Sequence, residues 1–399
     1  MTLQTNFEEF RHHQAEATVD YEKTYFQWGR RHLYPTLLER EDKGCYPTEA
    51  FRLIGQHGYF YTGHSENQAG SIFHEIQALK GLAKGSLDIP FCLSMMVHSG
   101  MGLKILNTFG SPEQKSRWLN SGLEGLSMFG IANTENSGGT DLKSISSSLV
   151  TAADNPETGT LTVNKSIASN VGDSDLILTS VWKIRENNKP RLEIVLLDKN
   201  LVTQKPLDDS LSGFRCGKTG SLSSGGPVEI HIPTYQLGPD GSGGHILRTM
   251  FNLDRLYMTA IVSGILSGTL KLAFEFIDKR KSMGKALKDY QYIQDKIIRI
   301  YTAKNNLDGI LSQILSGGNK VGVEDLEAFS DQLCVAKMHS MDQGLDACIA
   351  FYEIFGARAY QKKHPAGKLI RDILAFKFLG GSKEQQKMIL FQSLSKQYA

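Results

Sequence analysis

Apolar and polar residues follow three different patterns along the chain, and each pattern predicts its own kind of structure. Up to about residue 125, apolar positions recur at helical spacing, as they do in the segment 21–40. From about 126 to 238, short β-branched runs such as Leu176–Trp182 and Leu192–Leu197 stand between clusters of turn residues. Long helical patterns then return. The sequence therefore predicts an α+β fold with a helical domain over 1–125, a strand domain over 126–238 and a second helical domain over 239–399.

Local signals mark where some of these elements begin and how they pack. Ser111-Pro112-Glu113-Gln114 combines a capping serine, a proline at the first helical position and a glutamine at the third, which predicts a helix start. The run Val228–Pro233 alternates between apolar and polar residues, as a strand does. Small residues four apart, Ser263-Gly264 and Ser267-Gly268, permit close packing between helices. The turn-rich segment 238–244 joins the second and third regions.

Composition and charge exclude several classes of protein. The net charge is +2, which gives no electrostatic argument for nucleic-acid binding. No apolar run reaches the roughly 18–20 residues that cross a bilayer, and the polar start does not resemble a signal peptide. The five cysteines are scattered without a CxxC pair, and His12-His13 has no third ligand nearby. We expect a cytoplasmic protein with no membrane span, no disulfide framework and no metal site.

Two glycine-containing motifs carry the chemical information. The first is Phe-Gly-Ile-Ala-Asn-Thr-Glu-Asn-Ser-Gly-Gly-Thr-Asp over residues 129–141, and the second is Arg-Asp-Ile-Leu-Ala-Phe-Lys-Phe-Leu-Gly-Gly-Ser over 371–382. With the order of helical and strand regions, these motifs resemble the acyl-CoA dehydrogenase family over nearly the whole chain. The resemblance implies a β-sandwich or barrel-like middle domain, a carboxyl-terminal four-helix bundle and FAD as the cofactor.

The resemblance assigns one set of residues to the isoalloxazine ring of FAD. Ala132, Thr134 and Thr140 belong to the first motif, whose backbone and hydroxyl groups hydrogen-bond the flavin in the family. Ser169 would be a further hydroxyl near the ring. Ile167 stands where the family often has the tryptophan that covers the flavin. Without the family, the first motif reads only as a tight glycine-rich turn.

A second set is implied to reach the FAD of a neighbouring subunit, and it therefore implies a homotetramer or homodimer. Its segments resemble the family's Arg-x-x-Phe-Gly-Lys, a following Gln, and Gln-Ile-x-Gly-Gly; the residues are Arg280, Met283, Gln291, Glu353 and Gly356. An arginine fork suits a pyrophosphate. An anionic Glu353 in place of Gln would repel a pyrophosphate unless it is turned away or protonated.

Ser382 has two interpretations that can both hold. Ser382-Lys383-Glu384-Gln385 is a capping box, which gives the serine a structural role at a helix start. The free N–H groups of a helix start also suit an anionic or carbonyl group, so the resemblance adds Ser382 to the cofactor contacts.

The family's reaction requires a carboxylate that removes the α-proton of an acyl thioester while the β-hydrogen leaves as hydride to the flavin. Many members carry a glutamate just before the Gly-Thr/Ser pair, where this chain has Gly380. Glycine keeps the backbone N–H that helps to bind the thioester carbonyl in the family. A minority of members carry the base on the preceding long helix, just before a fixed arginine. That place holds Asp254, followed by Arg255, so the two departures form one coherent pattern.

Asp254 also has simpler interpretations. It could form an ion pair with Arg255 or favour a helix dipole, although adjacent residues on a helix diverge. Aspartate is one methylene shorter than glutamate, so the backbone or the substrate would have to lie closer. Glu135 and Glu384 are weaker candidates for the base.

The leading hypothesis is FAD-dependent α,β-dehydrogenation of an acyl thioester, with Asn252 and Arg255 beside the substrate. Asn252 replaces an aspartate common in coenzyme A-binding members, so coenzyme A and an acyl carrier protein both stay open as acyl carriers. The electron acceptor would be an electron-transfer flavoprotein or O2. One alternative is a flavin monooxygenase on the same fold, which needs no α-proton base. Another is a subunit that keeps the fold without flavin chemistry. His98 could line an acyl pocket, but a buried, hydrogen-bonded histidine is the simpler reading.

Overall fold

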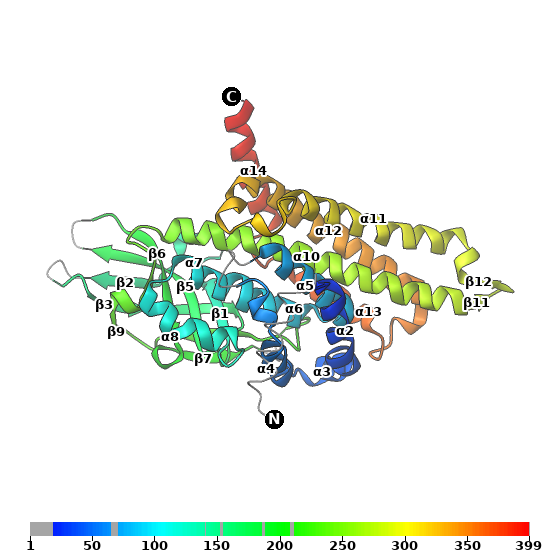
Figure 1. Cartoon of the computed structure of the whole chain (residues 1–399), viewed down its shortest axis with the longest axis horizontal. Coiled ribbons are helices and arrows are strands. Elements are labelled where there is room, and N and C mark those ends of the chain that lie inside the picture. The colour runs from blue at the N-terminus through cyan, green and yellow to red at the C-terminus, as the bar shows by residue number, and fades with distance from the viewer. Residues whose placement is uncertain are drawn as a thin grey trace.

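The computed structural model describes residues 19–64, 71–139, 141–151, 155–185, 188–207 and 211–398. It has helices at both ends of the chain and a sheet between them, as Figure 1 shows. The first helices are α2 (Tyr21–His32), α3 (Leu37–Lys43), α4 (Thr48–Gln56), α5 (Ile72–Ser86), α6 (Ile89–Met95), the π-helical η3 (Met96–Leu103), α7 (Lys104–Phe109) and α8 (Pro112–Leu123). The helical pattern over 21–40 is broken in the structure, because Pro35 cannot donate to a preceding turn.

The helix start predicted at Ser111 is confirmed. Ser111 Oγ accepts a hydrogen bond from the Gln114 N–H at 3.2 Å, and Gln114 Oε1 accepts one from the Ser111 N–H at 3.0 Å. The N–H groups of Ser111 and Gln114, at the start of α8, are therefore satisfied by each other's side chains.

The middle of the chain forms one mixed ten-stranded sheet. Its strands are β1 (Phe129–Thr134), β2 (Ser148–Thr151), β3 (Thr158–Thr162), β4 (Asn164–Ser169), β5 (Leu176–Arg185), β6 (Arg191–Asp198), β7 (Thr203–Pro206), β8 (Thr219–Ser223), β9 (Val228–His231) and β10 (Gln236–Leu237). The order is β7-β8-β4-β1-β5-β2-β3-β9, with β6 on the other side of β5 and β10 beside β6. The first half of β5 pairs with β1 and its second half with β2. The sheet buries an apolar cluster of its own, which includes Leu149, Val181 and Leu197.

The last third of the chain returns to helices. They are α10 (Gly243–Lys279), α11 (Gln291–Ile314), α12 (Ser330–Phe355), α13 (Pro365–Ala375) and α14 (Lys383–Tyr398), with a hairpin of β11 (Lys281–Ser282) and β12 (Lys285–Ala286) between α10 and α11. In Figure 1, α10 runs along the long axis from beside the sheet to this hairpin. A Cβ added at Gly264 or Gly268 would lie 2.5 Å from the carbonyl oxygen of Lys80 or Lys84 on α5. The close helix packing expected from these small residues is therefore confirmed.

Two helical stretches are long and apolar enough to cross a membrane by length and composition alone. They are Ile89–Phe109 and Gly243–Lys279, and their apolar windows are 100% and 61% buried within the fold. The sequence-based prediction that no stretch is long and apolar enough to cross a bilayer is therefore wrong. Their burial identifies them as core helices, which pass the same test as membrane spans.

His98 is a buried, hydrogen-bonded core residue, which confirms the simpler of its two interpretations. Its Nδ1 accepts a hydrogen bond from the Phe129 N–H at 3.0 Å, and Nε2 lies 3.0 Å from the Gly122 carbonyl oxygen. The rings of Phe51 and Phe60 pack against it edge-on. Burial lowers the pKa of His98 to about 3, so the ring stays neutral and links η3 to β1.

Candidate active site

Three neighbouring side chains of α10, Asn252, Asp254 and Arg255, are buried in the fold. Arg255 Nη1 donates a 2.7 Å hydrogen bond to Asn252 Oδ1, three residues earlier on the same helix. Arg255 therefore does not take Asp254 as its partner, and the expected divergence of adjacent helical side chains is confirmed. The Arg255 Nε atom is buried without a hydrogen-bond partner, so this guanidinium has a donor left for a bound group.

The structure brings Asp254 and Gly380 together, although 126 positions separate them in the sequence. Gly380 has φ +62° and Gly381 has φ +91°, so both lie in the region that favours glycine. A Cβ added at Gly380 would lie 1.7 Å from Asp254 Oδ2. The Asp254 carboxylate thus occupies the space that any side chain at position 380 would need. Asp254 is only 3% exposed.

Lys337 on α12 is the third member of this cluster, and none of the sequence motifs includes it. Its Nζ lies 3.3 Å from Asp254 Oδ2, donates a 2.7 Å hydrogen bond to the Leu379 carbonyl oxygen and contacts Met258 Sδ. The Lys337 side chain is fully buried. Burial lowers the pKa of its ammonium, and the charge of Asp254 acts in the opposite direction. A signal was present, because Lys337 shares one face of α12 with the apolar residues Leu333 and Met341.

The segment after Gly380 is tied to the start of α14. Ser382 Oγ accepts a hydrogen bond from the Gln385 N–H at 3.3 Å, which confirms Ser382 as a cap. The buried Gln386 side chain reaches back, with Nε2 at 3.4 Å from the Gly380 carbonyl oxygen and 3.5 Å from that of Gly381. The two glycines are therefore held between α12 and α14.

Part of the expected flavin set meets on two adjacent strands. In the antiparallel β1–β4 pair, Thr134 lies opposite Ile167, and Ile131 lies opposite Ser169. Ile167 is 51% exposed, so an apolar side chain faces outward beside the half-buried Thr134. The Ala132 carbonyl oxygen accepts a hydrogen bond from the Thr179 hydroxyl within the sheet. Thr140 lies outside the described residues.

The second expected flavin set lies elsewhere. Arg280 follows Asp254 by 26 residues, and a helix rises about 1.5 Å per residue, so about 39 Å separates them. Arg280, Gln291 and Gly356 are exposed, and Met283 is 94% exposed. The exposed Glu353 forms an ion pair with the partly buried Lys296 at 3.3 Å. Within one chain, this set cannot share a site with Asp254.

Glu135 does not reach the Asp254 cluster. Its carboxylate accepts hydrogen bonds from Lys165 Nζ at 2.8 Å, from the Ser146 N–H at 2.6 Å and from the Ser147 N–H at 3.1 Å. Burial raises the pKa of Glu135, but these hydrogen bonds outweigh it and lower the pKa to about 2. Glu135 therefore joins β4 to the 146–147 segment as a structural ion pair. Glu384 is exposed on the first turn of α14.

We expect Glu135→Gln to destabilise the fold by about 3 kcal/mol near neutral pH, because Lys165 would stay buried without a counter-charge. The folded pKa lies below the unfolded value of about 4.3, so the carboxylate stabilises the fold above that value. This contribution is lost as the pH falls towards 2. Denaturant unfolding at pH 7 and pH 3 measures this effect. The difference in unfolding free energy between the wild type and Glu135→Gln should be smaller at pH 3 than at pH 7. The double variant Glu135→Gln/Lys165→Met should recover part of the loss at pH 7, and no recovery would contradict the pairing.

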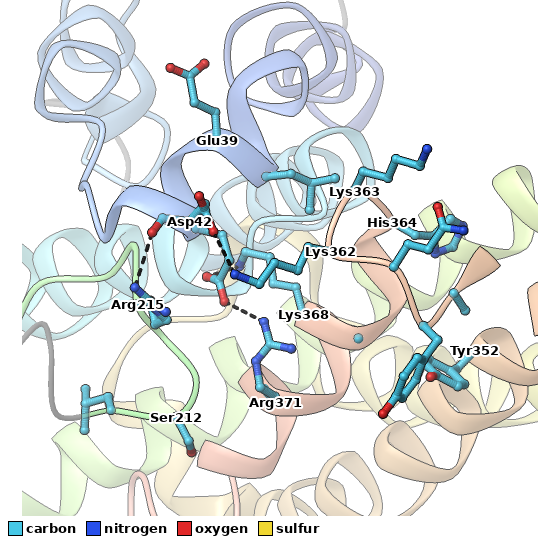
Figure 2. Close-up of a pocket in the computed structure, with 17 residues that line it drawn as sticks. Glu39, Asp42, Ser212, Arg215, Tyr352, Lys362, Lys363, His364, Lys368 and Arg371 are labelled. Atoms are coloured by element: carbon cyan, nitrogen blue, oxygen red, sulfur yellow. Dashed lines mark hydrogen bonds and ion pairs between the residues drawn. The ribbon is translucent and has the colours of Figure 1, made fainter. Parts of the chain in front are cut away.

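A surface pocket of about 660 Å³ lies away from these residues, between α3, the 211–215 segment and the region around α13. On its wall, Arg371 pairs with the Glu41 carboxylate at 2.8 Å and Lys362 with the Asp42 carboxylate at 3.4 Å. Arg215 donates a hydrogen bond to the Asp42 backbone carbonyl oxygen, and Figure 2 shows Arg215 and Lys362 both directed towards Asp42. Lys368, which also lines the pocket, contacts the buried Asp372. Burial raises the pKa of Asp372 to about 6, against the effect of Lys368. None of the residues expected at the active site lines this pocket.

Across the described residues, no group of three or more His, Cys, Asp or Glu side chains is placed to hold a metal ion. All five cysteines are free, and only Cys45 is exposed.

Comparison with known proteins agrees with this architecture. The sequence models "Acyl-CoA dehydrogenase, N-terminal domain" and "Acyl-CoA dehydrogenase, C-terminal domain" match residues 16–126 and 241–395. The short-chain specific acyl-CoA dehydrogenase of Megasphaera elsdenii is 24% identical over 392 residues, which cover 94% of this chain and 97% of that protein. The structure of the prolyl acyl carrier protein oxidase AnaB superposes with a TM-score of 0.84 at 20% identity, covering 94% of this chain and 97% of the other. The structure titled "PigA with FAD and proline" has a TM-score of 0.82 at 17% identity, with the same coverage.

The helix–sheet–helix fold and the two matching domain models place this chain among the flavoprotein oxidoreductases. It belongs to the acyl-CoA dehydrogenase family.

Proposed function

We propose that this chain binds FAD and catalyses the α,β-dehydrogenation of an acyl thioester, with Asp254 as the base that takes the α-proton. The observation that carries the proposal is the contact between the buried Asp254 carboxylate and Gly380. A carboxylate on α10 fills the place beside the backbone of residue 380 where a glutamate side chain would otherwise begin. The shorter aspartate is sufficient there because the peptide itself comes close.

The donor chemistry of the described residues fits FAD. Neutral hydroxyls at Thr134 and Ser169 on adjacent strands suit the ring, because they hydrogen-bond without losing a proton. The exposed Arg280, just after α10, and Gln291, at the start of α11, suit a dinucleotide held by a second subunit. When bound, FAD supplies the acceptor for the β-hydride. The separation between the two sets supports a homo-oligomer in which each site draws on two chains.

The chain's own residues would perform three tasks in this reaction. Asp254 receives the α-proton on one carboxylate oxygen. The backbone N–H of Gly380 donates a hydrogen bond to the thioester carbonyl oxygen, where negative charge develops as the proton leaves. Arg255, held by Asn252, offers its unpaired Nε–H to a polar part of the substrate.

The acyl group would be carried by coenzyme A or by an acyl carrier protein, and the prolyl acyl carrier protein oxidase among the similar structures supports testing both. Electrons would pass to an electron-transfer flavoprotein or to O2. We expect the enzyme to work in the cytoplasm.

The test is an anaerobic titration of the FAD-bound protein with acyl thioesters on coenzyme A and on carrier protein, followed at the visible flavin absorbance. We expect at least one thioester to bleach the flavin. If none does while dithionite still reduces it, the dehydrogenase proposal fails. Oxygen consumption with a reductase would then favour a monooxygenase, and a protein that cannot retain FAD would favour a non-catalytic subunit.

A further inference from the structure

The buried ammonium of Lys337 joins the two parts that the proposed reaction needs. It contacts Asp254 Oδ2 on α10 at 3.3 Å and the Leu379 carbonyl oxygen at 2.7 Å. Burying a lysine ammonium costs free energy unless charged or polar groups around it replace its contacts with water. Both of its oxygen partners belong to the cluster around Gly380, and neither lies on α12.

The Leu379 contact fixes the direction of a neighbouring donor. The Leu379 carbonyl and the Gly380 N–H belong to one planar peptide unit, and in a trans peptide they point in opposite directions. A hydrogen bond that holds the carbonyl oxygen towards α12 therefore aims the N–H away from α12. Donation to the carbonyl oxygen also polarises the peptide, which makes its N–H a stronger donor.

The Asp254 contact controls charge. Arg255 is the other nearby cation on α10, and its Nη1 is committed to Asn252. On α12, Cys334 lies one turn before Lys337, and burial raises the pKa of its thiol, which therefore stays neutral. The 379–381 segment and α14 present carbonyl oxygens and the neutral amide of Gln386. Among the described residues, Lys337 is thus the cation in direct contact with the Asp254 carboxylate.

We propose that Lys337 is a positioning residue: its charge contact holds the Asp254 carboxylate in its buried place, and its hydrogen bond to Leu379 orients the Gly380 N–H towards the thioester carbonyl. This inference rests on the proposed dehydrogenation. It adds a residue that links the base to the hydrogen-bond donor through one side chain. The ammonium contacts the Leu379 carbonyl oxygen at 2.7 Å and Asp254 Oδ2 at 3.3 Å, so one side chain serves both groups.

The test compares Lys337→Met, Lys337→Gln and Lys337→Arg in the FAD-bound protein. The readout is the anaerobic rate of flavin reduction by the thioester that reduces the wild type, measured from pH 5 to 9. Lys337→Met and Lys337→Gln both remove the positive charge that contacts the buried carboxylate. We expect the acidic limb of the pH profile to move up by about 1 unit or more in the Met and Gln variants. Lys337→Arg should return the limb to the wild-type position.

The Met and Gln variants separate the two tasks. Glutamine can still donate to the Leu379 carbonyl oxygen, whereas methionine cannot. At a pH above the limb, we expect Lys337→Met to lose about 100-fold in rate, the size of effect that a 1 Å misplacement produces, and Lys337→Gln to lose less. If Lys337→Met does not fold, the pH shift in Lys337→Gln still decides the charge argument.

Lys80→Met is the control, because it removes a lysine that joins two other elements, α5 and α11, through Asp308. It should lower thermal stability without moving the pH limb. The positioning role would be overturned if the acidic limb of the Lys337→Gln pH profile did not move. It would also be overturned if Lys337→Met lowered the rate of flavin reduction equally at every pH and by no more than Lys80→Met does. A wild type that no thioester reduces would instead overturn the proposed function, so the two failures are distinguishable.

Discussion

Asp254→Asn should lower the rate of flavin reduction by an acyl thioester by about 10²–10⁴-fold, the usual contribution of a positioned general base. Asparagine has nearly the same shape as aspartate and can still accept a hydrogen bond from Lys337. The variant therefore removes proton-accepting ability while changing the contact with Gly380 very little. Rapid mixing under anaerobic conditions, with the visible absorbance of the flavin as the signal, measures this rate directly.

Loss of an ion pair needs its own control, because Asp254→Asn leaves the charge of Lys337 buried without a counter-ion. Such a loss is expected to lower stability by about 3 kcal/mol. Asp308→Asn removes the carboxylate that pairs with Lys80 and Lys304 between α5 and α11, in a cluster separate from Asp254 and Gly380. It should destabilise the protein and leave the reduction rate near that of the wild type. A rate for Asp254→Asn within tenfold of the wild type, at full FAD content, would place the base elsewhere.

Much of the architecture could be predicted because it depends on local patterns. The three-part division follows from the change between helical and strand periodicity, and the start of α8 follows from one capping box. The predicted elements differ from the structure where a proline interrupts the pattern. Pro35 divides a helical pattern, and the strand predicted over 228–233 ends at His231, where Pro233 opens the short helix α9 (Ile232–Tyr235).

The candidate site was predictable only in part, because its contacts join distant segments. The resemblance to the family identified Asp254 and Gly380 as a pair, and the fold places them in contact. Lys337 could not be assigned from spacing, since 83 residues separate it from Asp254 and only the packing of α12 on α10 unites them. Glu135 shows the same limit, because its role is determined by Lys165 on another strand. A charged residue within an apolar helical face was the one local signal of the missing partner.

Gly380→Ala should show whether Asp254 and residue 380 compete for one space. The added Cβ would lie 1.7 Å from Asp254 Oδ2, and the backbone has φ +62°, a conformation that costs an alanine about 1–2 kcal/mol. Either the carboxylate must leave Lys337 or the 379–381 peptide must move, and both shifts misplace the catalytic groups. We expect a loss of at least about 100-fold in flavin reduction and a lower unfolding temperature.

Two further variants isolate the steric contact. Gly309→Ala on α11 is the control, because nothing lies within 4 Å of the added Cβ, and it should raise helix stability by about 0.5–1 kcal/mol. Asp254→Ala/Gly380→Ala removes the atoms that collide, so its unfolding free energy should exceed the value expected from adding the two single losses. Activity should stay absent, because the double variant has no base. Additive losses in this cycle would mean that the two residues do not share the space, and the argument for a relocated carboxylate would lose its structural support.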